Sequence, residues 1–319
     1  MPLIDMPLAK LREYQGRNPR PKDFDNYWNK ALREMRSTNP NLKLVRSEFQ
    51  VNCADCFNMY FTGVRGARIH AKYLRPNNIK KPHPAVIMFH GYAGNAGDWN
   101  DKLNYVALGF SVAALDCRGQ GGLSEDKGGI KGTTYKGHII RGLNDSPDAL
   151  LFRHIFLDTA QLAGIVMSMP EVDPKRVGAT GGSQGGGLTL ACAALEPRIK
   201  KAASIYPFLC DYQRVWEMDL AQHAYEELRT FFRQFDPRHE RENEIFNRLG
   251  YVDIQYLAGR IRAETLMITN LMDTTCPPST QFSAYNKIKA RKKMIIHPDF
   301  AHETAPGSND AVFSFIAGL

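Results

Sequence analysis

The sequence predicts an α/β fold, in which helices cover both faces of a doubly wound, mostly parallel sheet. Short and nearly continuous apolar runs such as Ala85–His90 and Phe110–Asp116 are typical of strands buried on both faces. Segments of helical periodicity separate these runs, and strands that alternate with helices form such sheets. The 319 residues, of which 43% are hydrophobic, can bury a sizeable core.

The first part of the chain departs from this alternation. Residues 1–42 are polar and helix-like, and Trp28 and Leu32 are suited to dock this extension onto the body of the protein. Alternating apolar and polar residues follow, and such alternation predicts half-buried antiparallel strands. These strands are expected at Leu44–Val51, Phe57–Val64 and Arg68–Leu74.

Beyond the two apolar runs, helices and strands alternate to the end of the chain. One apolar face of a long helix is formed by Leu151, Ile155, Leu162 and Val166. A last helix is expected over Asn309–Leu319. The remaining strands are expected at Arg176–Thr180, Ala202–Ile205, Thr265–Thr269 and Lys293–His297.

A charged, aromatic-rich segment, residues 211–259, interrupts the alternation between two of these strands. Its pattern predicts helices, and both a cap over the carboxyl edge of the sheet and an oligomer contact fit it. Internal repeats and low-complexity linkers are absent from the sequence. We therefore predict one domain, residues 1–319, with an N-terminal extension (1–42) and a helical insert (211–259).

Composition and charge argue against several classes of protein. No apolar run approaches the roughly 20 residues that cross a bilayer, and the N-terminus lacks the apolar core of a signal peptide. We therefore expect a cytoplasmic protein without a membrane partner. The formal charge of +8 is spread along the chain, and its densest run, Lys287–Lys293, is not part of a recognisable nucleic-acid module. A solvated basic face is the simpler interpretation.

Five glycines surround Ser183 in the stretch "GGSQGGG", at positions 181, 182, 185, 186 and 187. The part from Gly181 to Gly185 matches G-x-S-x-G between an expected strand and an expected helix, which is the context of a nucleophile elbow. No lysine follows the glycines as in a phosphate-binding loop, and the stretch comes too late in the sheet for a dinucleotide fingerprint. Ser183 is therefore the candidate nucleophile.

A nucleophile elbow requires an acid and then a histidine later in the chain. Asp273 follows one expected strand, and His302 follows the next strand and precedes the last helix. A single loop aspartate or histidine is usually solvated, but here three residues occur in the required order, each after its own strand. We predict a Ser183–Asp273–His302 catalytic triad.

Stabilising the charge on a reacting carbonyl oxygen requires two N–H donors. One is expected from the residue after the nucleophile, Gln184, and the other from the loop after an early strand, most simply Tyr92. His90 precedes the serine in the chain, so we interpret it as a residue that shapes this loop rather than as the catalytic base.

The motifs "HGYAGNAGDW", "DCRGQGG", "GHIIRGL", "GGSQGGG", "LMDTTCPPS" and "AHE" occur in one order along the chain. In this respect the sequence resembles the family of acetyl xylan esterases and cephalosporin C deacetylases, through nearly its whole length. The family signature falls on Arg118-Gly119-Gln120, on the elbow and on His302-Glu303. Gly182 and Ala301 depart from residues common in the family.

The resemblance implies an α/β-hydrolase fold and serine-dependent removal of acetyl groups from small acetylated carbohydrates. It also implies an intracellular homo-oligomer, often a hexamer, without a metal or an organic cofactor. From the chemistry of the signature residues we further expect a bidentate ion pair between Arg118 and Glu303, which would hold the His302 loop beneath the Ser183 turn.

The predicted function is a serine esterase acting on acetylated xylo-oligosaccharides, with cephalosporin C as a further candidate substrate. Three alternatives stay open. A serine peptidase uses the same triad, and a longer-chain carboxylesterase would need an apolar lid that residues 211–259 do not resemble. An inactive binding module of the same fold would have no chemical reason to keep all three triad residues.

Overall fold

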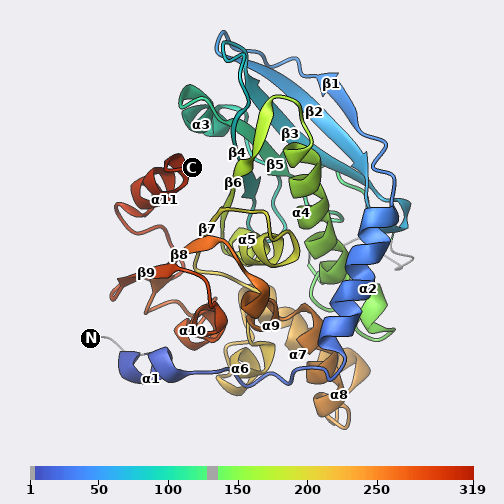
Figure 1. Ribbon diagram of the computed structural model, residues 1–319. Helices are drawn as coiled ribbons and strands as arrows, with labels where there is room; N and C mark the ends of the chain where they lie inside the picture. The colour runs from blue at the N-terminus through green and yellow to red at the C-terminus, as the bar shows by residue number, and fades with distance from the viewer. Residues whose placement is uncertain (1–3, 128–135) are drawn as a thin grey trace.

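The computed structural model describes residues 4–127 and 136–319, and within them one sheet contains nine strands in the order β1-β2-β3-β5-β4-β6-β7-β8-β9 (Figure 1). The pairs β1–β2, β2–β3 and β3–β5 are antiparallel, and all pairs from β5 to β9 are parallel. The strands are β1 (Lys43–Arg46), β2 (Ala54–Thr62), β3 (Arg68–Pro76), β4 (His83–Phe89), β5 (Ser111–Leu115), β6 (Val172–Gly182), β7 (Lys201–Ile205), β8 (Glu264–Asn270) and β9 (Lys292–His297).

Helices cover both faces of this sheet, as predicted. In β5 the side chain of Val112 packs with α3 and α11 on one face, whereas Ala113 and Leu115 face the larger core that contains α4 and α5. The helices are α1 (Leu8–Glu13), α2 (Phe24–Ser37), α3 (Leu103–Ala107), α4 (Leu151–Met167), α5 (Gln184–Leu195), α6 (Tyr212–Glu217), α7 (Glu226–Phe235), α8 (Glu242–Leu249), α9 (Ile254–Leu257), α10 (Pro278–Lys287) and α11 (Ser308–Ala317).

The first strand is shorter than the sequence predicts. It was expected over Leu44–Val51, but β1 ends at Arg46. The side chain of Gln50 donates to the Ser47 and Cys56 carbonyls and accepts from the Cys56 N–H (2.8, 2.8 and 3.1 Å). These bonds replace strand pairing, so the alternating pattern continues after the strand has ended.

The N-terminal extension docks through α2, as expected, although residues 1–3 of the predicted range lie outside the described residues. Trp28 is fully buried, its ring stacks on Phe156 of α4 with centroids 6.0 Å apart, and its indole N–H donates to the Tyr251 carbonyl (2.9 Å). In Figure 1 α2 runs alongside α4 on the outside of the molecule. The extension is therefore packed on the sheet layer and on the insert at once.

Asp211, the first residue of the insert, joins the insert to the extension. Its buried carboxylate accepts hydrogen bonds from the Tyr14 hydroxyl (2.8 Å) and from the backbone N–H groups of Arg17 and Asn18 (3.0 and 2.8 Å). The insert itself is helical as predicted, with α6 to α9 between β7 and β8. These helices lie next to the carboxyl ends of the parallel strands (Figure 1).

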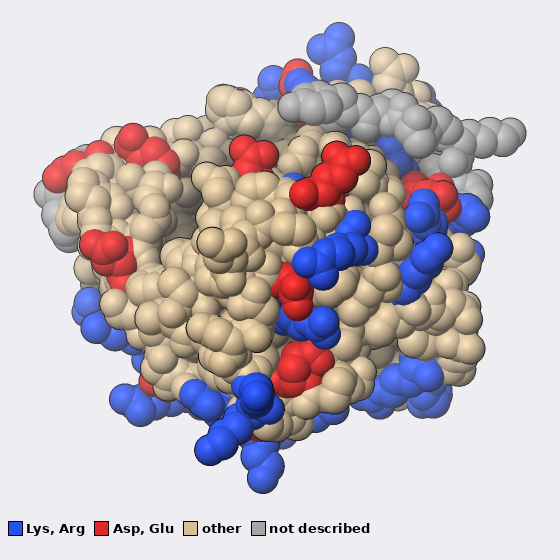
Figure 2. Space-filling view, turned by 90° about the horizontal axis from the view of Figure 1, so that it is seen from above, with Lys and Arg blue, Asp and Glu red and all other residues tan. Residues whose placement is uncertain are grey.

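The charged side chains are mixed on the face that Figure 2 shows. Among the described residues drawn there, Lys and Arg stand beside Asp and Glu around a broad area without charged residues, and they form no continuous basic surface. Among the described residues, no helix combines the length and the apolar character that crossing a membrane requires.

Candidate active site

Ser183 occupies a sharp turn between β6 and α5 at the carboxyl edge of the sheet. Its φ of 57° and ψ of −121° are strained for a residue with a side chain, at a cost of about 1–3 kcal/mol. Two hydrogen bonds hold the turn, one to the last residue of β7 and one to the segment that follows β7. The Ser183 N–H donates to the Ile205 carbonyl, and the Ser183 carbonyl accepts from the Phe208 N–H, both at 3.0 Å. The strand–turn–helix context expected of the G-x-S-x-G motif is present.

The glycines of the turn let backbone segments approach closely. A Cβ added at Gly181 or Gly185 would lie 2.6 or 2.2 Å from the Phe89 carbonyl oxygen of β4, which is far inside contact distance. At Gly182 the nearest atom, in the Tyr206 ring, would lie 3.6 Å away. Packing therefore requires the first and last glycines of the motif but leaves room for a methyl group at Gly182.

We expect Gly185→Ala to lower the free energy of unfolding by about 2–3 kcal/mol, because the added Cβ must push β4 and α5 apart. Gly182→Ala is the matched control, with an expected change within about 1 kcal/mol. Urea unfolding of both variants measures the difference. Equal stability of the two variants would contradict this account of the turn.

Asp273 follows β8 and His302 follows β9, so three parallel strands bring the predicted triad to one edge. The His302 Nε2 lies 2.9 Å from the Ser183 Oγ, and the His302 Nδ1 lies 2.8 Å from the Asp273 Oδ2. The other oxygen of Asp273 accepts from the N–H groups of Thr275 and Cys276 (2.9 and 2.7 Å). Asp273 is fully buried, whereas the side chain of His302 is 23% exposed.

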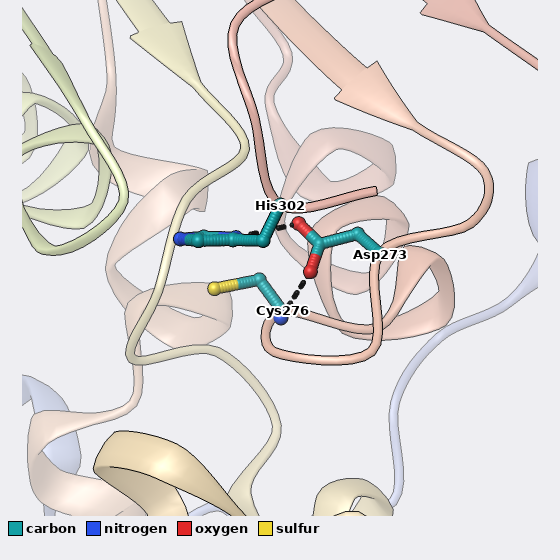
Figure 3. A group of neighbouring side chains, drawn as sticks. All are labelled: Asp273, Cys276 and His302. Carbon is teal, nitrogen blue, oxygen red and sulfur yellow. Dashed lines mark hydrogen bonds and ion pairs between the residues drawn. The ribbon is translucent and has the colours of Figure 1, made fainter. Parts of the chain in front are cut away.

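Cys276 lies beside the triad and was not singled out by the sequence motifs. Figure 3 shows its side chain running alongside the imidazole of His302, below Asp273. Burial, together with the Asp273 carboxylate, raises the pKa of the Cys276 thiol well above its usual value, and contact with the Ser183 side chain opposes this. The thiol is therefore protonated and serves as a neutral packing group next to the nucleophile.

Aspartate, cysteine and histidine are also zinc ligands, and one ligand atom each from Asp273, Cys276 and His302 lie within 4.8 Å of one another. Asp273 and His302 nevertheless contact each other directly, and both Asp273 oxygens already accept hydrogen bonds. A metal would have to break this Asp–His contact. The arrangement suits a proton relay better than a metal centre.

The predicted oxyanion donors, Tyr92 and Gln184, lie on two segments that contact each other. The Gln184 Nε2 donates to the carbonyl of Gly91, which precedes Tyr92 (3.4 Å). The side-chain amides of Gln184 and Gln120 also donate to each other (2.9 and 3.0 Å). Gln120 thus fixes the residue after the nucleophile, which gives this signature residue a physical role. The role of Tyr92 and Gln184 as donors to substrate stays a prediction.

The predicted ion pair between Arg118 and Glu303 is wrong. Arg118 is fully buried and forms a bidentate pair with Asp158 of α4, at 2.6 and 2.5 Å. Glu303 is exposed, and its carboxylate accepts from the N–H of Ala301 (3.1 Å). A buried guanidinium needs a buried carboxylate, and the loop after β5 meets that need on α4. Gly119, which follows Arg118, adopts a φ of 68° in this loop.

The His302 loop is held instead by Asn270, the last residue of β8. Its Nδ2 donates to the carbonyls of Ala301 and Glu303 (2.7 and 2.8 Å), which flank the histidine. A polar residue at the end of an apolar strand was the available signal, but its partner could not be inferred. His90 shapes its loop as expected, because its Nε2 accepts from the Cys117 N–H (3.0 Å).

Comparison with known proteins agrees with this geometry. The family described as acetyl xylan esterase (AXE1) matches residues 1–319. Acetyl xylan esterase 1 from a Thermoanaerobacterium species is 62% identical, with a TM-score of 0.96 over 98% of this chain and 99% of that one. An acetyl xylan esterase from a Paenibacillus species is 34% identical, with a TM-score of 0.92 over the same shares of the two chains.

Among curated proteins, the acetyl esterase Axe7A of Xylanibacter ruminicola is 27% identical over 91% of this chain. The chain spans 65% of that relative's length, so that relative is a longer protein, whereas a second curated relative matches over 49% of this chain and 54% of its own length. The family match and the two solved structures, by contrast, extend over essentially the whole chain. The chain therefore belongs to the acetyl xylan esterase family and has the α/β-hydrolase fold.

Proposed function

We propose that the protein removes acetyl groups from small acetylated carbohydrates, xylo-oligosaccharides above all, through an acetyl-Ser183 intermediate. It is then an acetyl xylan esterase, which is a carboxylic ester hydrolase. The observation that carries the proposal is the continuous contact from the Ser183 Oγ through His302 to the buried Asp273, at 2.9 and 2.8 Å. The family to which the chain belongs supports the acetyl ester as substrate.

In the first half of the reaction, neutral His302 takes the proton of the Ser183 hydroxyl while its oxygen bonds to the acetyl carbon. Asp273 keeps the His302 proton on Nδ1 and stabilises the imidazolium that forms. The N–H groups of Tyr92 and Gln184 donate to the carbonyl oxygen as it becomes negative. The C–O bond to the sugar then breaks, and His302 gives its proton to the leaving alcohol.

In the second half, water replaces the sugar alcohol. His302 takes a proton from this water, whose oxygen attacks the acetyl carbon, and the same donors hold the negative oxygen. The bond from the acetyl carbon to Ser183 breaks, the proton on His302 returns to the serine, and acetic acid leaves and ionises to acetate in water. Both halves therefore require His302 in its neutral form.

Acetate release from acetylated xylo-oligosaccharides tests the proposal, with Ser183→Ala beside the wild type. A long-chain ester and an aminoacyl anilide represent the rival esterase and peptidase. We expect kcat/KM on the acetylated sugar to exceed both others by about tenfold or more, since even one methylene can change it by that factor. Faster cleavage of either rival substrate would replace the proposal with that activity.

A folded wild-type protein that cleaves none of these esters would instead favour the binding module. Cephalosporin C, whose acetyl group is an ester of the same kind, is the second substrate to assay. The homo-oligomer, for which the resemblance suggests a hexamer, the cytoplasmic location and the single-domain division stay predictions from the sequence and its resemblance. Size-exclusion chromatography with light scattering measures the first of them.

A further inference from the structure

A buried acid of the insert is bound to backbone far from it in the sequence. Glu227, in the first turn of α7, is only 4% exposed. Its Oε2 accepts from the N–H groups of Ile139 and Ile140 (2.7 and 3.3 Å), and its buried Oε1 has no hydrogen-bond partner among the described residues. Two successive backbone N–H groups thus converge on one carboxylate oxygen, as they would on a bound anion.

The segment held in this way lies against Tyr92. The N–H of His138 donates to the Tyr92 hydroxyl (3.4 Å), and the two rings lie 5.1 Å apart. Tyr92 carries one of the two proposed oxyanion donors, on its own backbone N–H. A chain of direct contacts therefore leads from the insert through His138 to the loop of the active site.

A second chain of contacts starts two residues earlier in the insert, at Tyr225. Tyr225 is fully buried, and its ring lies 4.2 Å from that of Phe208. Phe208 meets the Tyr92 ring edge-on at 5.8 Å, and its N–H donates to the Ser183 carbonyl. Tyr92 is therefore held between residues that the insert fixes on two sides.

Within the described residues, few charged or titratable groups lie around Glu227. Lys136 and His138 lie on the facing segment, and Glu226 lies on the same helix as Glu227. Lys136 and Glu226 form an ion pair at the surface (3.3 Å), with side chains 62% and 55% exposed. Burial raises the pKa of Glu227 to about 7, and the backbone N–H groups oppose this rise. The ionised carboxylate, which the backbone N–H groups favour, therefore forms as the pH passes about 7.

We propose that Glu227 is a positioning residue that fixes residues 137–140, and through His138 the Tyr92 loop, in the conformation that binds the oxyanion. The proposal rests on the proposed function, because it takes Tyr92 as a donor. It also assigns the insert a role at the active site. The sequence had left two roles open for the insert, a cap over the sheet and an oligomer contact.

The test compares Glu227→Gln with Glu226→Gln, which makes the same charge change one residue away on an exposed side chain. Glu227→Gln is expected to lower kcat for an acetyl ester about tenfold with KM within twofold, less than the 10²–10³-fold loss from deleting a whole oxyanion donor. Glu226→Gln is expected to leave kcat within twofold. Equal values of kcat for the two variants would overturn the proposal.

The ratio of wild-type to Glu227→Gln kcat is then followed from pH 5 to pH 9. Protonated Glu227 resembles glutamine, so the ratio is expected to be near one in acid and to rise about tenfold as pH passes 7. A ratio that is independent of pH indicates a merely structural defect and overturns the proposal.

Hydrogen exchange of the 137–140 amides provides a readout without catalysis. We expect exchange at least fivefold faster in Glu227→Gln than in the wild type or Glu226→Gln. If the wild type cleaved no ester, the proposed function would fail, and this comparison would still decide whether Glu227 holds the segment. Unchanged exchange overturns the positioning role whatever the activity.

Discussion

Ser183→Ala is expected to lower kcat about 10⁶-fold on acetylated xylo-oligosaccharides, because it removes the atom that bonds to the acetyl carbon. His302 then has no hydroxyl to deprotonate at 2.9 Å, and no acetyl-enzyme can form. The remaining rate comes from the oxyanion donors and from substrate binding alone. Steady-state acetate release, together with mass spectrometry of the trapped acetyl-enzyme, measures both consequences.

The control for this substitution is Ser168→Ala. The Ser168 hydroxyl donates only to the Ile165 carbonyl of its own helix (2.6 Å), and we expect wild-type kcat from that variant. Alanine fits the Ser183 turn as serine does, so the thermal midpoint of Ser183→Ala should stay near that of the wild type. A folded Ser183→Ala protein that retained a tenth of the activity would rule out Ser183 as the nucleophile.

Asp273→Asn is expected to lower kcat about 10⁴-fold, although the new side chain has nearly the same shape. The carboxylate accepts from the N–H groups of Thr275 and Cys276 with one oxygen and from His302 with the other. An asparagine keeps its oxygen toward the backbone donors and turns its NH2 group toward the His302 Nδ1. The ring proton of His302 then lies on Nε2. That nitrogen can therefore no longer accept the proton of Ser183.

Asp299→Asn makes the same change on an exposed loop residue between β9 and α11, and its kcat is expected to equal that of the wild type. Nuclear magnetic resonance of the ring nitrogens identifies the tautomer of His302 in Asp273→Asn. Full activity with the proton on Nε2 would refute the proton relay proposed for this site.

The triad residues could be found in the sequence because strand order places them. In a parallel sheet the carboxyl ends of all strands meet at one edge, so Ser183, Asp273 and His302, each following its own apolar run, come together without further information. The glycines near Ser183 add a local signal, since close backbone approach excludes a Cβ at Gly181 and Gly185.

The partners of long polar side chains could not be found in this way. Arg118 and Glu303 both lie at the same edge of the sheet, and their charges suggest a pair. Arg118 instead enters the layer beneath and meets Asp158, which lies in α4 and belongs to none of the motifs. The choice depends on which side chain is buried, and burial follows from helix packing that strand order does not specify.

The insert illustrates the same limit. Its helices were predictable from its pattern, but the depth at which each side chain is buried was not. Glu226 and Glu227 are adjacent acids with equal propensities, and only the packing of α7 against residues 136–140 buries one of them and exposes the other. Functional residues of this kind become visible only when the contacts are known.

The contact between Asp211 and residues 14–18 constrains the order in which parts of the protein can fold during synthesis. During synthesis the N-terminal segment leaves the ribosome first, yet the carboxylate that holds it is made 193 to 197 residues later. Until then Tyr14 and Asn18 lack this partner, and closing so long a loop is slow. Docking of the extension is therefore a late event. A nascent chain halted before Asp211 would not dock its extension. Loss of protease sensitivity at residues 14–18 would show that docking has occurred.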